Sequence, residues 1–356
     1  MKVTGLTTIQ ATLDAVGEHY AVLPLQGQAV ICVTQRGGRV IGLYPKADGP
    51  NLLWTNHQVL ADAGAFRSFA AGNNWNLGGE RIWIAPEIQY IIQDRRDFWG
   101  THRLPESIDP GHYALKASDQ TVHLTQSLTL HAYNLAQGEK HLTVERAFSP
   151  IPNPLRTLTA GDDLMAGVQF IGYAQRVTLT EINETPILSE SWNLVQLQPG
   201  GVLYIPTLGD VESTPYFGDV PEEARTLAAP HHLRLNITGT RQYKVGYKAT
   251  SMTGRMAYLN TLADGRAYLL VRHFDSNPSA TYAEEPPDMP GVHGHSVHVY
   301  NDGGGFGGFG EMECSGQAIG GSTGRTTSTD VFRMWAYVGA MSRLKPILYA
   351  LTGITV

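Results

Sequence analysis

Short runs of apolar and β-branched residues, separated by glycine-containing turns, recur along most of this chain. The first three are Tyr20–Leu25, Ala29–Gln35 and Arg39–Tyr44. The run Thr121–Leu130 alternates apolar and polar residues, which is typical of a strand with one buried face. With 39 Gly and 20 Pro among 356 residues, the chain has enough turn residues for many such strands. The pattern predicts an all-β fold of antiparallel sheets.

One short N-terminal helix is expected at Thr7–Glu18, where apolar residues fall near helical spacing and Gly17 is a stop signal. Loops are expected at Pro215–Pro230 and Asp275–Pro290, which is rich in proline. There is no internal repeat or composition shift, so we expect one domain over residues 1–356. The remaining strands are expected at Leu142–Phe148, Val168–Glu181, Ser189–Leu197, Val202–Ile205, Leu233–Ile237, Tyr243–Tyr247, Arg255–Leu259, Ala267–Phe274, Ser296–Tyr300, Phe332–Val338 and Ile347–Leu351.

The composition restricts the partners and the compartment. Apolar residues make up 42% and charged residues 16%, as in a globular chain with a large core. The formal net charge of -6 argues against a nucleic-acid or anionic-membrane surface. Cys32 and Cys314 are too few for a disulfide framework or a zinc-finger ligand set. No apolar leader or bilayer-length run is visible, so a cytoplasmic protein is expected.

Residues 73–87 combine indoles, amides, carboxylates and one guanidinium around the Gly78-Gly79 pair. Indoles offer flat apolar faces, and the polar groups offer directional hydrogen bonds, a mixture that suits a sugar. The alternative is a hairpin that turns at the two glycines, with the tryptophans in the core and a structural ion pair. The candidate sugar-binding residues in this stretch are Trp75, Asn76, Glu80, Arg81, Trp83 and Glu87.

A second cluster of candidates lies far along the chain, within residues 293–300. His295 and His298 are candidates for a proton donor, and Tyr300 for a stacking face. The same histidines, with His293, could instead bind a metal or serve a structural role. His102, which follows the aromatic pair Phe98-Trp99, is one further candidate for substrate binding.

Glu311 and Glu313 follow a glycine-rich segment and would face the same side of a strand. Two such carboxyl groups can differ in acidity, one serving as acid and the other as base. The alternative is a solvated sheet face. The glycine-rich segment itself is no phosphate-binding loop, because neither the required lysine nor a helix signal follows it.

Several segments together resemble the galactose-mutarotase-like superfamily, the aldose 1-epimerases, as an outlying branch. The resembling segments are Asn51–Trp54, Asn76–Glu87, Trp192–Leu197 with Pro199–Gly201, Val297–Asp302 and Phe309–Glu313. The resemblance implies a β-supersandwich that holds a sugar on its concave face. It also implies that Arg81 binds sugar hydroxyls and that Glu313, or next Glu311, removes the anomeric proton.

The sequence departs from the epimerase pattern at the catalytic acid. Ser189 stands where the epimerase histidine would fall, so the acid would have to be His102, His295 or His298. We therefore expect a carbohydrate-active enzyme that works by general acid/base proton transfer, epimerase-, lyase- or glycosidase-like. The assigned roles are Glu313 as base, Arg81 as clamp, and His298 or His295 as acid. No cofactor is expected for this activity. The first alternative is a non-catalytic saccharide-binding protein. The second is a metal-dependent enzyme that binds a divalent metal through His293–His298.

Overall fold

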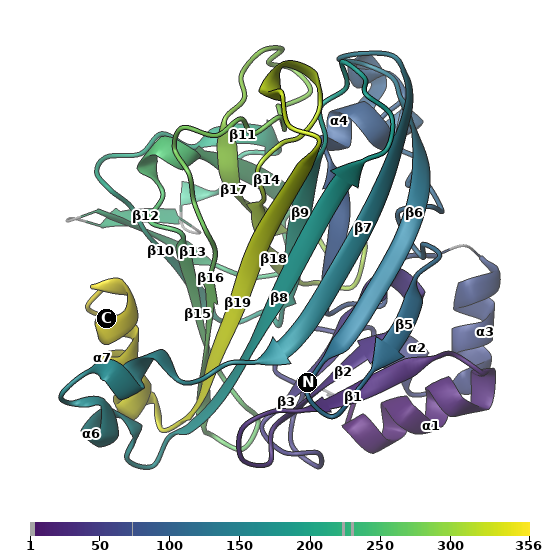
Figure 1. Ribbon diagram of the computed structural model, residues 1–356. Coiled ribbons are helices and arrows are strands. Elements are labelled where there is room, and N and C mark those ends of the chain that lie inside the picture. The colour runs from purple at the N-terminus through teal and green to yellow at the C-terminus, as the bar shows by residue number, and fades with distance from the viewer. Residues whose placement is uncertain (1–3, 73, 223–224, 229–230) are drawn as a thin grey trace.

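The computed structural model describes residues 4–72, 74–222, 225–228 and 231–356. Strands are the predominant regular structure, and they build two large sheets stacked face to face (Figure 1). Neighbouring strands in both sheets run antiparallel. The predicted all-β architecture of antiparallel sheets with a short N-terminal helix is therefore confirmed. Asn73, the first residue of the 73–87 stretch, lies outside the described residues.

The first sheet has nine strands in the described part of the chain. In spatial order they are β1 (Tyr20–Pro24), β2 (Val30–Thr34), β3 (Val40–Tyr44), β4 (Glu80–Ala85), β9 (Glu190–Leu197), β18 (Gly310–Ser315), β17 (His295–Asn301), β14 (Tyr243–Lys248) and β11 (Thr214–Phe217). Strands from the beginning, middle and end of the chain are therefore neighbours in this sheet.

The second sheet has ten strands among the described residues. In spatial order they are β12 (Arg225–Ala228), β13 (His232–Asn236), β10 (Val202–Pro206), β15 (Arg255–Thr261), β16 (Ala267–His273), β19 (Thr327–Gly339), β8 (Gln169–Glu181), β7 (Gly138–Pro150), β6 (Val122–Ala132) and β5 (Ala114–Ala117). The long strands β6, β7, β8 and β19 run side by side (Figure 1).

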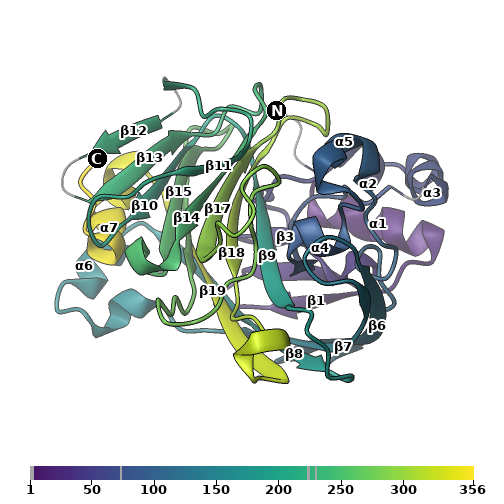
Figure 2. The same cartoon turned by 90° about the horizontal axis from the view of Figure 1, so that it is seen from above.

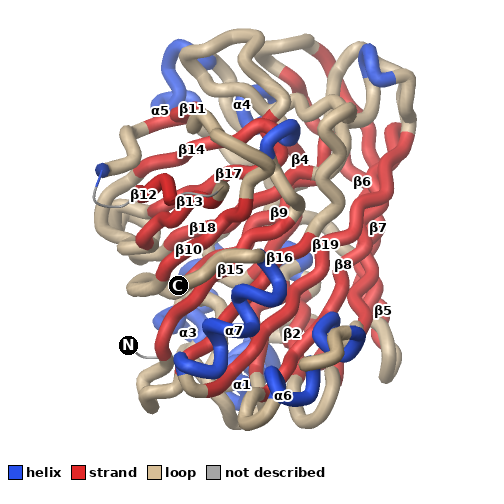
Figure 3. The backbone as a smooth tube through the Cα atoms, turned by 90° about the vertical axis from the view of Figure 1, so that its left-hand side faces the viewer, coloured by secondary structure: helices blue, strands red, loops and turns tan. Residues whose placement is uncertain are grey.

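The helices are short and lie around the sheets (Figure 3). Figure 2 shows α1, α2 and α3 gathered on one side of the molecule, with α6 and α7 on the opposite side. The α-helices are α1 (Leu6–Val16), α2 (His57–Leu60), α3 (Ala63–Ala71), α4 (Glu87–Tyr90), α5 (Phe98–Thr101), α6 (Gly161–Met165) and α7 (Met341–Thr352), and the 3-10 turns are η1 (Arg36–Gly38), η2 (Arg95–Asp97), η3 (Pro154–Thr157), η5 (Ala249–Ser251) and η6 (Gly321–Thr323). In the part of the chain that the structure describes, each helix is too short or too polar to span a bilayer.

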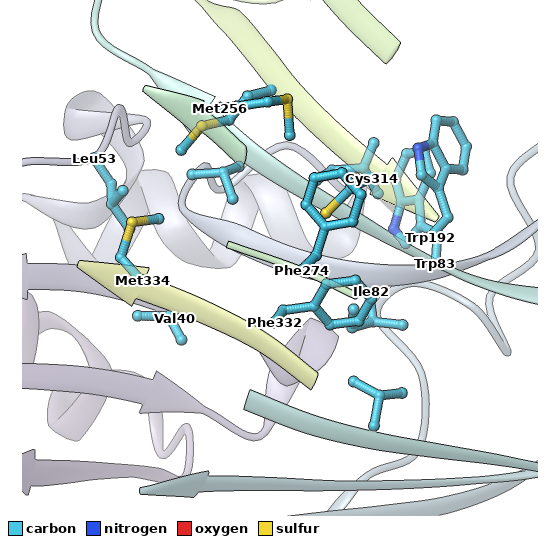
Figure 4. Packing of buried hydrophobic residues seen from close by; sticks show 14 of the residues in the cluster. Val40, Leu53, Ile82, Trp83, Trp192, Met256, Phe274, Cys314, Phe332 and Met334 are labelled. Carbon is cyan, nitrogen blue, oxygen red and sulfur yellow. The ribbon is translucent and has the colours of Figure 1, made fainter. Parts of the chain in front are cut away.

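The main core lies between the two sheets. Strand β6 alternates buried and exposed residues along its whole length, as the pattern at Thr121–Leu130 predicts. Figure 4 shows Ile82 and Cys314 of the first sheet, and Phe332 and Met334 of the second, among these packed side chains. In β6, period-two alternation thus places one face of the strand in this core.

The sequence-based assignment is wrong at the end of the chain, where Ile347–Leu351 belongs to helix α7 and not to a strand. The buried residues Leu344, Ile347, Leu348 and Leu351 follow helical spacing and pack on the outer face of the second sheet. A run of only five residues hides this longer period, because short apolar runs fit a helix or a strand equally well.

The interval Pro215–Pro230 also differs from the prediction, because it is not a continuous loop. Pro215 lies within β11, and β12 pairs with β13 at a sheet edge. Both are four-residue edge strands, and such strands leave little trace in the sequence pattern. The segment Asp275–Pro290 contains neither helix nor strand, as predicted.

Candidate functional site

The pocket floor is built by the middle strands of the first sheet. Arg81 and Trp83 share one face of β4, while Ile82 and Ile84 point into the core between the sheets. Cross-strand pairs continue that face across the sheet, since directly opposed residues lie on the same side. These pairs are Arg81–Leu194, Leu194–Glu313, Glu311–Tyr300 and Tyr300–Lys244. Five strands therefore supply the floor of one pocket.

The pocket encloses about 480 Å³ when space open to solvent is counted, and about 60 Å³ of it can hold the centre of a water-sized sphere. Its walls come from the segment before β4, from α5, from β11 and from the glycine-rich segment before β18. Its lining residues are Trp75, Arg81, Trp83, Glu87, Trp99, His102, Trp192, Leu194, Phe217, Lys244, Tyr300, Phe306, Glu311 and Glu313. Aromatic rings thus surround a small set of charged groups, an arrangement typical of small-molecule sites.

The charged groups on the floor are paired with one another. Arg81 Nη1 lies 2.7 Å from Glu311 Oε1, and these side chains are 1% and 5% exposed. Lys244 Nζ lies 2.8 Å from Glu87 Oε2 and 3.9 Å from Glu313 Oε2. His102 Nε2 lies 3.9 Å from Glu87 Oε1, closer to the pocket mouth. Two cations therefore lie among three carboxyl groups from distant parts of the chain.

Both cations also rest on indole faces. The Arg81 guanidinium lies 4.2 Å from the ring centroid of Trp83 and 5.1 Å from that of Trp75. Lys244 Nζ lies 4.1 Å from the ring of Trp192. Trp83 and Trp192 meet edge to face at 5.8 Å and lie next to each other in Figure 4. These contacts hold the cations in place and stabilise their charge.

Glu313 is the carboxyl group whose acidity the fold changes most clearly in this pocket. Burial raises the pKa of Glu313 to about 8, against the opposing effect of the Lys244 cation. The indole Nε1 of Trp192 donates a hydrogen bond of 2.9 Å to Glu313 Oε2. Burial by itself would lower the pKa of Lys244, but the charges of Glu87, Glu313 and Glu284 raise it on balance. Glu313 therefore holds a proton at neutral pH beside a permanent cation.

The structure brings most of the sequence-predicted site residues into this one pocket. Those that line it are Trp75, Arg81, Trp83, Glu87, His102, Tyr300, Glu311 and Glu313. Asn76 lies just outside the lining. Its side-chain amide donates a hydrogen bond of 2.8 Å to the Phe306 carbonyl oxygen and accepts one of 3.0 Å from the Gln196 side chain. Asn76 therefore supports the pocket wall.

Glu80 points away from the pocket, into the space between the sheets. Its Oε2 lies 2.8 Å from Nη2 of Arg272 on β16, and it accepts hydrogen bonds from the Tyr173 hydroxyl and the Asn193 amide. Because successive residues of a strand face opposite sides, Glu80 and Arg81 cannot both line the same pocket. The sequence-level assignment of Glu80 to the sugar site does not match this position.

His295 and His298 are buried outside the lining of the pocket. Burial lowers the pKa of His295 to about 4, and its ring nitrogens lie 3.0 Å from the Tyr216 hydroxyl and 2.9 Å from that of Thr214. Burial also lowers the pKa of His298 well below its usual range. A neutral imidazole is a poor proton donor, so neither ring is suited to act as a general acid at neutral pH.

Ser189 stands where an epimerase would carry its catalytic acid. It is buried, and its hydroxyl oxygen lies 2.5 Å from the Tyr90 hydroxyl oxygen.

Lys244 is a charged lining residue of the pocket that was not among the candidates named from the sequence. It sits in the strand Tyr243–Lys248, whose other residues are mostly apolar, and it is 2% exposed. A lysine within a strand-like apolar run is a signal in itself, because lysines are almost never fully buried unless paired. The other lining residues not assigned from sequence are Trp99, Trp192, Leu194, Phe217 and Phe306.

In the described residues, no three His, Cys, Asp or Glu side chains form a group that could hold a metal ion. The metal-dependent hypothesis for residues 293–298 stays a prediction, which metal analysis of the purified protein with and without chelator tests.

Solved structures with a similar course of the chain include two of the group that the sequence resembles. A galactose mutarotase related enzyme from Lactobacillus acidophilus aligns at 5% identity and a TM-score of 0.48, covering 90% of this chain and 97% of its own. The GalM/aldose epimerase homologue from C. elegans aligns at 9% identity and a TM-score of 0.44, covering 91% of this chain and 99% of its own. The Slr1438 protein from Synechocystis sp. PCC 6803 aligns at 11% identity and a TM-score of 0.46, covering 90% of this chain and 94% of its own. Similarity of this degree says nothing about chemistry.

No curated protein matches this chain in sequence. Residues 8–356, nearly the whole chain, match one protein family. The chain belongs to this family, DUF6786, which is described as a family of unknown function.

Proposed function

We propose that this protein is a carbohydrate-active enzyme that transfers a proton to or from a sugar bound in the pocket. The observation that carries the proposal is the meeting of Arg81, Glu311 and Glu313 with Lys244 beneath a ring of aromatic side chains. Sugars present apolar ring faces that stack on indoles, and hydroxyls that bind carboxylates and cations. The pocket offers both kinds of contact within a few ångströms.

Glu313 and Glu311 divide the proton-transfer roles. Glu313, whose pKa burial raises to about 8, donates its proton first and can take one back later in the cycle, so its first role is that of acid and not of the base expected from the sequence. Glu311, held against the Arg81 guanidinium, is the acceptor. The two lie on the same face of β18, roughly 7 Å apart along the strand, so a sugar ring above that face can reach both. Lys244 stabilises the Glu313 carboxylate once its proton has left.

The test is NMR of a panel of aldoses, disaccharides and uronate-containing oligosaccharides mixed with the protein. We expect wild-type protein to give a new anomer, epimer, unsaturated or hydrolysed product from one member. Glu313→Gln keeps the shape and a hydrogen-bonding group, and is expected to lower the rate roughly 10²–10⁴-fold, as for loss of a general acid. The matched control is Glu139→Gln, an exposed carboxyl on β7 that should leave the rate unchanged. Full turnover by Glu313→Gln would remove Glu313 from the mechanism.

A non-catalytic saccharide-binding protein is the second candidate. The observation that favours it is that the charged groups are already paired, Arg81 with Glu311 and Lys244 with Glu87, and that both cations are almost fully buried. A binder would broaden the lines of one sugar in the same NMR panel and yield no product with wild-type protein.

A further inference from the structure

We propose that Trp99 is the stacking platform for a second sugar ring, so that the ligand is a glycoside or oligosaccharide, not a free monosaccharide. This inference rests on the proposed sugar site and goes one step beyond it, by naming what lies outside the pocket. It begins from the uneven exposure of the four indoles that line the pocket.

Trp99 is 52% exposed, whereas Trp83 and Trp192 are 4% and 3% exposed. Arg81 and Lys244 lie over Trp83 and Trp192. In the described residues no Lys or Arg lies over the ring of Trp99. The Trp99 side chain thus reaches the pocket with one part and presents the rest to solvent at its mouth. Exposed apolar surface at the rim of a pocket commonly marks a binding site.

The local structure holds this ring in place. Trp99 meets Phe98 and Phe217 edge to face at 4.9 and 5.2 Å, and stacks on His102 at 6.2 Å with 23° between the ring planes. Its helix α5 is capped by Asp97, whose carboxylate accepts a hydrogen bond of 3.2 Å from the Gly100 amide. A ring fixed in this way loses little conformational freedom when a ligand covers it.

The turn before α5 is also tied to the rest of the molecule. Arg95 lies 2.6 Å from Glu285 and donates to the carbonyl oxygens of Pro286 and Pro287 at 2.9 and 2.8 Å. These partners belong to the loop between β16 and β17, and β17 contributes Tyr300 to the pocket. The segment that carries Trp99 is therefore linked, through the loop between β16 and β17, to a strand of the pocket floor.

The position of Trp99 points to a second ring and not to an unrelated partner. Glu311 and Glu313 lie on the floor and are 4% and 1% exposed, so a ring that reaches them leaves its next glycosidic bond nearer the mouth. Phe306, 44% exposed, is a second aromatic ring there and packs on Trp75 at 5.6 Å. The flat apolar face of an indole matches the apolar face of a pyranose ring.

The experiment measures Kd by titration for matched sugar pairs: glucose with maltose and with cellobiose, and galactose with lactose. Wild-type protein should bind one disaccharide roughly 2- to 12-fold more tightly than its monosaccharide, if the second ring gains about as much as one aromatic ring stacked on another. Trp99→Ala should remove that advantage by weakening the disaccharide more than the monosaccharide, while Trp99→Phe should keep part of it. The control is Tyr349→Ala on helix α7, an equally exposed aromatic residue outside the pocket lining.

Two results overturn the inference alone: equal wild-type affinity for both members of every pair, or an equal loss for both in Trp99→Ala. The first shows that no second ring is held, and the second places Trp99 in the site of the first ring. If wild-type protein binds no member of any pair, the sugar site itself is contradicted, and the second subsite with it.

Discussion

At the scale of single residues, Glu311 and Glu313 have identical side chains, but the fold gives their carboxyl groups different neighbours. Glu311 lies against Arg81, and Glu313 lies against an indole N–H with Lys244 farther away. The sequence puts both on one face of a strand, but it does not say which cation each one meets. Only the neighbours contributed by β4 and β14 separate their roles.

The raised pKa of Glu313 predicts a pH dependence of stability. Between about pH 4.5 and 8, the folded state keeps a proton on Glu313 that the unfolded chain releases. Stability attributable to this group is therefore present at low pH and falls as pH rises, by at most about 1.4 kcal/mol per pH unit. Glu313→Gln should flatten that decline in urea unfolding measured from pH 5 to 8.

Glu139→Gln, which changes an exposed carboxyl, serves as the control and should keep the wild-type slope. A Glu313→Gln slope equal to that of the wild type would show that Glu313 titrates normally in the folded protein.

At the scale of elements, helix α7 is the clearest case in which a short pattern misleads and a longer one informs. Ile347–Leu351 is a five-residue apolar run, but Leu344 three residues earlier and Leu351 complete a helical stripe. That stripe covers the outer face of β15, β16 and β19, which is apolar there. The inner face of this sheet packs in the main core, so its apolar outer face would contact water if α7 did not cover it.

Leu348→Ala should therefore lower the free energy of unfolding by about 2–5 kcal/mol, through lost burial and a cavity under α7. Tyr349→Ala, the neighbouring exposed position, should change it by less than about 0.5 kcal/mol. Chemical denaturation monitored by circular dichroism measures both. Equal effects of the two substitutions would mean that α7 does not pack on the sheet through Leu348.

At the scale of the whole molecule, the two sheets are joined by a buried polar group as well as by apolar packing. Glu80 on β4 contacts Arg272 on β16, and Tyr173 and Gln175 on β8. Glu80 and Arg272 are both fully buried. Removing one member of such a pair leaves a buried charge without its partner, which costs far more than the pair itself contributes.

Arg272→Met should therefore destabilise the protein by about 3–5 kcal/mol. The double variant Glu80→Met with Arg272→Met should recover much of that loss, because no unpaired charge remains. Urea unfolding of the three proteins gives both numbers. A single variant within about 1 kcal/mol of the wild type would show that the pair is not isolated from water.

The sequence by itself determined most of the strands and the faces of those strands. Period-two alternation is local, so it shows that Arg81 and Trp83 share a side, as do Glu311 and Glu313, and the same rule would have excluded Glu80. Residue types also pointed to a site built from distant segments of the chain, and eight of the residues named for it line one pocket.

Only the tertiary structure decided which strands are neighbours. Arg81 and Glu311 are 230 residues apart and meet because β9 lies between β4 and β18, a pairing that no local pattern specifies. The same long-range order brought Lys244 into the pocket and buried His295 and His298 beside it as neutral rings. Burial and charge neighbours set acidity, and both depend on the packed sheet and not on the order of residues along the chain.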